Sequence, residues 1–177
     1  MRRAGVLIAV TLVACSRNPA GPPDRSRLVA NWSGSDTGRL VTRAVAEWCD
    51  SLRVLEIRGV KGDTGMALAI FPINSVTADS YPAVPPLRAD SVRPAAAIAI
   101  RWFAETAING FQGESGAIII EAADSQRVWG RFEARVRSVT EGGRLFIKGS
   151  FFDVPIVPAA RGCTRRTQPE PADSDVN

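Results

Sequence analysis

The sequence predicts an all-β domain, an antiparallel β-sandwich of about seven or eight strands. Apolar and polar residues alternate over most of the region between Leu28 and Pro158, which is the period of a half-buried strand. Short segments of glycine, acidic and hydroxyl residues separate these runs, and such residues favour turns. A small closed β-barrel would give the same pattern. The uneven, proline-rich loops, notably residues 82–94, favour the sandwich.

The strand-like runs are 38–48, 52–60, 66–72, 81–84, 116–122, 128–139 and 144–154. The run at 128–139 alternates most regularly, and a Thr-Glu-Gly-Gly turn at 140–143 joins it to the run at 144–154, which predicts a β-hairpin. A second hairpin is expected where residues 61–65 join the runs at 52–60 and 66–72.

The stretch at 95–110 fits two interpretations. The proline just before it, its alanine-rich middle and its Asn-Gly end are typical of a helix. Ile98, Ile100 and Trp102 alternate, however, and the neighbouring segments are all strand-like. We therefore expect a strand at 96–104 followed by an irregular loop.

An acid, a hydroxyl residue and a glycine recur at 35–38, 62–65 and 113–116, where they predict similar turns. Asp36, Asp63 and Glu114 hold equivalent places in these segments, so calcium is the metal to consider. The Asp-x-Asp-x-Asp-Gly run of a calcium loop is missing, and turn acids usually stabilise only their own turn. We expect no cofactor and no metal site.

Residues 1–14 have the form of an export signal, with Arg2 and Arg3 before an apolar run that ends at Ala14. Its eleven residues would reach about 16 Å as a helix, against roughly 30 Å for a bilayer core. The ending Leu12-Val13-Ala14-Cys15 resembles the bacterial lipobox, which implies a diacylglyceryl group on Cys15 and cleavage before it. An ordinary secretory signal is the alternative. Ser16 after the cysteine suggests that the lipoprotein is sorted to the outer membrane.

The mature chain would then have three parts. Residues 15–27 are polar and proline-rich, which predicts a flexible linker that follows the lipidated cysteine. Residues 28–163 would form the β-sandwich domain, and residues 164–177 would form a disordered tail. The segments "GFQGESGAIII", "GRFEARV" and "RLFIKGSFFDVPI" resemble uncharacterised β-rich bacterial lipoproteins across residues 50–157. That resemblance implies a β-rich fold and a location in the cell envelope, and it implies no activity.

Three cysteines are present, and lipidation of Cys15 would leave Cys49 and Cys163. In an oxidising compartment such a pair normally forms a disulfide, and this one would tie the end of the domain to its beginning. Two free buried thiols are the alternative.

The composition weighs against several functions. Histidine is absent, which removes the commonest metal ligand and the usual general base. A net charge of +4 without a long basic run does not indicate nucleic-acid binding. Gly113-Glu114-Ser115-Gly116 does not have the Gly-x-Ser-x-Gly spacing of a nucleophile elbow. We therefore expect a protein that is not an enzyme.

The alternation at 128–139 places Trp129, Arg131, Arg135 and Arg137 on one outward face. They are the candidate binding patch, because exposed tryptophan and arginine often anchor partners. The alternative is a solvated face.

We expect the chain to be a lipid-anchored envelope protein, held in the outer membrane by its lipid, that binds an envelope protein or a glycan. A carrier of small apolar ligands with a barrel cavity is the alternative, and an enzyme of unrecognised chemistry is the third hypothesis.

Overall fold

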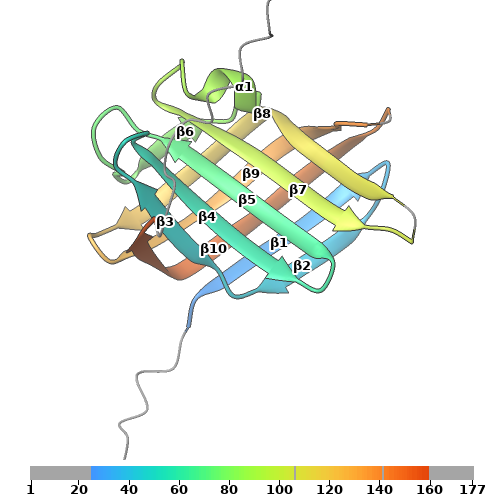
Figure 1. Cartoon of the computed structure of the whole chain (residues 1–177), viewed down its shortest axis with the longest axis horizontal. Coiled ribbons are helices and arrows are strands. Elements are labelled where there is room, and N and C mark those ends of the chain that lie inside the picture. Colours follow the sequence, from blue (N-terminus) through green and yellow to red (C-terminus); the bar gives the residue numbers. More distant parts are fainter. Residues whose placement is uncertain (1–24, 106, 141, 160–177) are drawn as a thin grey trace, which may run out of the picture.

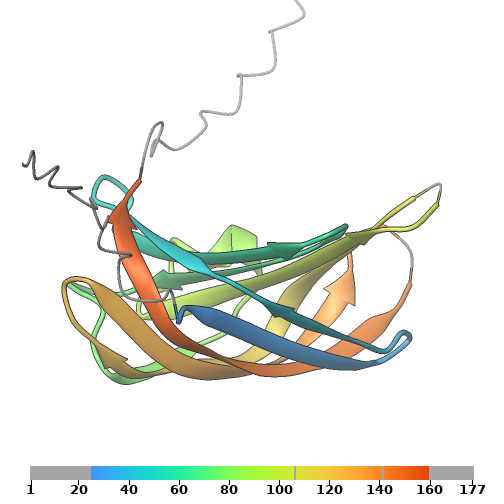
Figure 2. The ribbon, with the colours of Figure 1, turned by 90° about the horizontal axis from the view of Figure 1, so that it is seen from below.

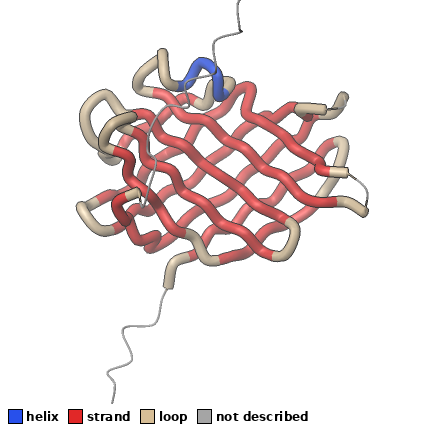
Figure 3. Tube along the Cα trace, viewed as in Figure 1, coloured by secondary structure: helices blue, strands red, loops and turns tan. Residues whose placement is uncertain are grey.

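The computed structural model describes residues 25–105, 107–140 and 142–159. This part of the chain folds into ten β-strands and one four-residue helix (Figure 3). The strands are β1 (Arg27–Gly34), β2 (Gly38–Thr42), β3 (Val45–Cys49), β4 (Val54–Lys61), β5 (Thr64–Phe71), β6 (Asp79–Pro82), β7 (Ala95–Phe103), β8 (Ile108–Ala123), β9 (Arg127–Ser138) and β10 (Arg144–Pro158), and the helix is α1 (Pro86–Ala89).

The strands form two layers that cross each other (Figure 1) and enclose the core between them, as the turned view shows (Figure 2). One layer has the antiparallel order β3-β4-β5-β7 and continues into the first half of β8. The other layer has the order β2-β1-β10-β9 and continues into the second half of β8, which also pairs with β6. The last residues of β10 pair with β3 in parallel.

Two long strands turn the corners between the layers. β8 pairs with β7 through Gln112 and with β6 from Ala117 onward, and its ladder with β9 shifts register between Gly113 and Ser115. β10 shifts register between Phe151 and Val154 before it reaches β3. An extra residue in one strand of a pair bends that strand, so these β-bulges let one strand serve both layers.

Arg127 stabilises the corner in β10. Asp153 has a positive φ of 55°, a left-handed conformation that costs energy for a residue other than glycine. The guanidinium of Arg127 pairs with the Asp153 carboxylate at 2.8 Å and donates to its backbone carbonyl at 3.1 Å. These contacts hold the bulged residue in place.

Side chains from both layers fill the space between the sheets. The largest fully buried ones are Leu28, Leu40, Leu55, Ile57, Leu68, Ile70, Ile98, Ile100, Ile118, Ile120, Leu145 and Phe151. They come from strands in which every second residue is buried, as the period-two pattern requires. The interior is therefore a packed core.

The predicted all-β antiparallel architecture is confirmed, as are both hairpins and the strand expected at 96–104, which is β7. The irregular loop expected after that strand is wrong from Ile108 onward, because β8 begins there and pairs with β7. Ten strands replace the expected seven or eight because the run at 38–48 divides into β2 and β3 and because β1 was not recognised. The predicted linker at 15–27 is one residue too long, since Arg27 already pairs with Phe152. Cys15, Cys163 and the predicted tail lie outside the described residues.

The turn expected at 113–116 is wrong. These residues lie inside β8, at its corner, where Gly116 has a φ of 127°. Acidic, hydroxyl and glycine residues suit a bulge as well as a turn, because glycine takes positive φ without a clash of its Cβ. The turns expected at 35–38 and 62–65 are confirmed between β1 and β2 and between β4 and β5.

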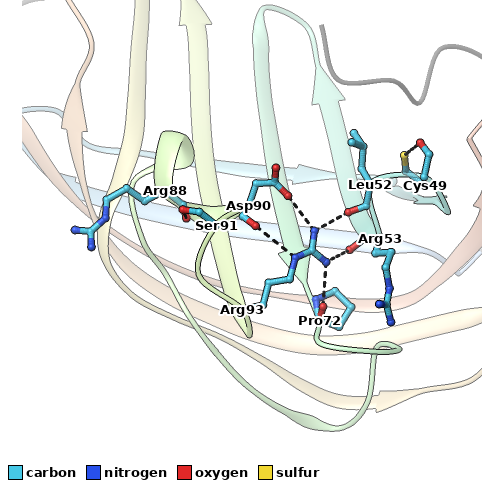
Figure 4. A network of polar contacts seen from close by, with 9 residues as sticks. Cys49, Leu52, Arg53, Pro72, Arg88, Asp90, Ser91 and Arg93 are labelled. Atoms are coloured by element: carbon cyan, nitrogen blue, oxygen red, sulfur yellow. Dashed lines mark hydrogen bonds and ion pairs between the residues drawn. The ribbon is translucent and has the colours of Figure 1, made fainter. Parts of the chain in front are cut away.

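Arg93 fastens the loop that contains α1 to the end of the domain (Figure 4). Its guanidinium donates to the backbone carbonyls of Leu52 at 2.7 Å, Arg53 at 2.9 Å and Pro72 at 3.1 Å. It also pairs with the Asp90 carboxylate at 3.0 Å. One planar cation thus joins three segments that are distant in the sequence.

Replacing Arg93 with alanine is expected to lower the free energy of unfolding by about 2 kcal/mol, because several hydrogen bonds from a charged donor are lost together. Arg88→Ala is the matched control, since that arginine lies on the same loop and its side chain points away from the network in Figure 4. Urea unfolding measures both. Equal losses for the two variants would contradict this role of Arg93.

Candidate functional site

The candidate site is an open groove on the outer side of the layer formed by β8, β9, β10 and β1. Its volume is about 810 Å³. Because alternate residues of these strands point into the core, the intervening side chains line the groove. Strand register orders them in three rows, which are Val29, Ser150, Arg131 and Ile119; then Asn31, Lys148, Glu133 and Ala117; then Phe146, Arg135 and Ser115.

Three arginines around the groove form exposed ion pairs. Arg131 pairs with Glu121 of β8. Arg137 and Arg144 both pair with Glu114, at 3.3 Å and 3.2 Å. Glu114 occupies the bulge at the corner of β8, so its one carboxylate pairs with arginines from two neighbouring strands. These ion pairs give some of the arginines on this basic face a structural role.

Three charged side chains in the groove stand apart from this network. Within the described part of the chain, Arg135, Glu133 and Lys148 make no side-chain hydrogen bond or ion pair, and all three are exposed. Lys148 lies opposite Glu133, and Phe146 lies opposite Arg135. Arg135 and Lys148 are therefore diagonal neighbours on adjacent strands, a distance that long side chains can bridge.

The structure divides the candidate patch that the sequence indicated. Arg131 and Arg135 line the groove, whereas Trp129 and Arg137 lie outside it on the same strand. Trp129 is half-buried, and Arg137 is held by Glu114. The sequence interpretation missed Lys148, Phe146 and Asn31, although the alternation at 144–154 was enough to place the first two on the outer face.

The residues considered for metal binding are dispersed. Asp36 lies in the turn before β2, Asp63 in the turn before β5, and Glu114 in the bulge of β8. Across the described ranges, no three His, Cys, Asp or Glu side chains are grouped so that they could hold a metal ion. Ser115, the serine of the Gly-Glu-Ser-Gly segment, is exposed at the edge of the groove beside Arg135.

Cys49 ends β3 and is buried, with 7% of its surface exposed. Its sulfur lies 3.6 Å from the Ser51 hydroxyl. The amide of Ala159 donates to the carbonyl of Trp48 at 3.0 Å, so the described chain ends next to Cys49. Cys163 follows four residues later, outside the described residues, and its disulfide with Cys49 stays a prediction.

A second, smaller pocket of about 430 Å³ opens at one end of the domain. Apolar side chains of Trp48, Leu55, Val76 and Ile156 line it together with polar residues of the adjoining loops. It is an open recess at the ends of β3 and β10. Among the described residues, no helix is both long and apolar enough to span a bilayer.

Comparisons of the chain with models of protein families, with curated proteins and with solved structures find no match. The function must therefore be argued from the groove and from the sequence itself.

Proposed function

We propose that the protein is a lipid-anchored cell-envelope protein whose β-sandwich domain binds a partner through the groove on β8, β9, β10 and β1. The lipid on Cys15 would hold the protein in the outer membrane, and residues 16–24 would tether the domain to it. The domain would act by binding and not by catalysis.

The groove is the observation that carries the binding function. It combines charged, amide, hydroxyl and aromatic side chains on one sheet, and Arg135 and Lys148 form no ion pair within the described chain, although Glu133 lies opposite Lys148. Convergent polar groups in a concave surface are typical of ligand sites. The packed core favours this surface over an interior cavity, so a carrier of apolar ligands has less support.

The anchor is supported by the order of features in residues 1–16. A positive start, a short apolar run and Leu-Val-Ala-Cys follow one another, as they do in bacterial lipoproteins. β1 begins at Arg27, which leaves at least ten residues between Cys15 and the domain. Fully extended at about 3.3 Å per residue, this tether could reach roughly 35 Å, enough to separate the domain from the headgroups.

A photo-crosslinking amino acid in place of Ser150, within the groove, tests the whole proposal in intact cells. We expect it to capture an envelope component in the native chain. Capture should fail in a Cys15→Ser chain, which should also take up no labelled palmitate. The matched control puts the same amino acid in place of Ala99, an exposed residue on β7 in the other layer. Equal capture from Ala99, or palmitate on the Cys15→Ser chain, would refute the proposal.

A further inference from the structure

We infer that the groove binds a sugar that carries an anionic substituent, with Arg135 and Lys148 holding the anion. This inference rests on the proposed function and names the ligand class for the same groove. It follows from two features of the groove. The first is which of its charged side chains form ion pairs, and the second is which residues surround the charged side chains that form none.

The charge balance of the groove points to one anionic group. Arg131 is neutralised by Glu121, which leaves Arg135 and Lys148 as cations and Glu133 as the only other charge in the lining. The groove therefore has one net positive charge. Arg135 and Lys148 are diagonal neighbours, about 7 Å apart at their Cβ atoms, so both cationic ends can reach one carboxylate or phosphate placed between them.

The surroundings of this pair suit a sugar ring. Phe146 lies opposite Arg135 and has 37% of its surface exposed, so it offers an apolar face next to the anion position. Asn31 and Glu133 lie opposite Lys148 on either side. An amide can donate to and accept from hydroxyl groups, and a carboxylate accepts from them.

Glu133 also argues against a dense polyanion. A strand of nucleic acid, or a run of acidic residues in a peptide, would bring further negative charges against this carboxylate in the centre of the groove. A sugar with one anion per ring brings hydroxyl groups there instead. The volume of about 810 Å³ lies within the range of small-ligand sites, about 300–1,000 Å³.

Isothermal titration calorimetry, which measures the binding affinity of the full-length lipidated protein in detergent, tests the inference. The probes are a galactose trimer with one galacturonic acid unit, galactose 6-phosphate, neutral galactotriose and hexaglutamate. We expect one or both anionic sugars to bind, with affinity falling as salt rises, because the contacts with the anion are exposed and screened. The acid trimer and the phosphate separate a carboxylate ligand from a phosphate ligand.

Variants then locate the site. Arg135→Gln and Lys148→Gln should each weaken binding of the anionic sugar about tenfold, since each removes a charged contact. Arg137→Gln should change it less than twofold, because that arginine lies on the same strand outside the groove. Equal binding of galactotriose or hexaglutamate, no binding of either anionic sugar, or equal losses for Arg135→Gln and Arg137→Gln would overturn the inference. Capture from Ser150 with no sugar binding would leave the proposed function standing.

Discussion

Gly149→Ala is expected to lower the free energy of unfolding by about 3 kcal/mol or more and to leave little folded protein at 37 °C. A Cβ atom on Gly149 would lie 2.0 Å from the carbonyl oxygen of Val29 and 2.5 Å from the ring of Phe132. The first of these neighbours is backbone, so relief requires that β1 and β10 move apart. That movement would break the ladder that attaches β1 and β2 to the rest of the sheet.

Gly142→Ala is the control, because a Cβ atom there meets no other atom within 4 Å. Its free energy of unfolding should stay within about 0.5 kcal/mol of the native value. Denaturation in urea, followed by tryptophan fluorescence, gives both numbers. A Gly149→Ala protein as stable as Gly142→Ala would show that β1 and β10 are not packed as closely as described.

Gly149 belongs to a reciprocal arrangement that explains the two Gly-x-Phe segments. In the β9–β10 ladder Gly149 lies opposite Phe132, and Gly130 lies opposite Phe151. A Cβ on Gly130 would lie 2.5 Å from the ring of Phe151. Each phenylalanine thus covers the glycine of the other strand, which compensates for the missing side chain in the core. The sequence shows both segments, but only the strand register shows that they pair.

The difference between local and long-range information explains how much could be predicted. Alternation is a local property, so the strands β4, β5, β7, β9 and β10 and the two hairpins could be recognised from the sequence. The bulges in β8 and β10 depend on which strands lie on either side, and nothing in the residues at 113–116 distinguishes a bulge from a turn. The crossing of the two layers therefore had to come from the structure.

The candidate site shows the same limit. Alternation along β9 alone placed Arg131 and Arg135 outward, and both line the groove. It could not show that Glu114 and Glu121 pair with Arg137 and Arg131, since these pairs join β9 to β8. The separation of paired from unpartnered cations needs the register of three strands. That separation is the basis of the ligand class inferred above.

Trp102→Ala is expected to cost about 3 kcal/mol of folding free energy, because it removes the middle member of an aromatic stack that joins the two layers. Trp102 of β7 stacks on Trp32 of β1, with ring centroids 5.6 Å apart, and on Phe111 of β8, at 5.2 Å. All three pack against the core at one end of the domain. The loss would leave a cavity between Trp32 and Phe111 that the crossed sheets cannot close without shifting.

Two comparisons separate this role from the general cost of removing a tryptophan. Trp102→Phe keeps a ring in the stack and should recover at least half of the lost stability. Trp129→Ala removes a half-buried tryptophan that lies on the outside of one layer, and we expect a cost near 1 kcal/mol. Urea denaturation measures stability, and near-ultraviolet circular dichroism reports the stack directly. If Trp102→Ala and Trp129→Ala lost equal stability, the contact of the two layers at this end would not depend on the stack, and packing of the aliphatic core would have to account for it alone.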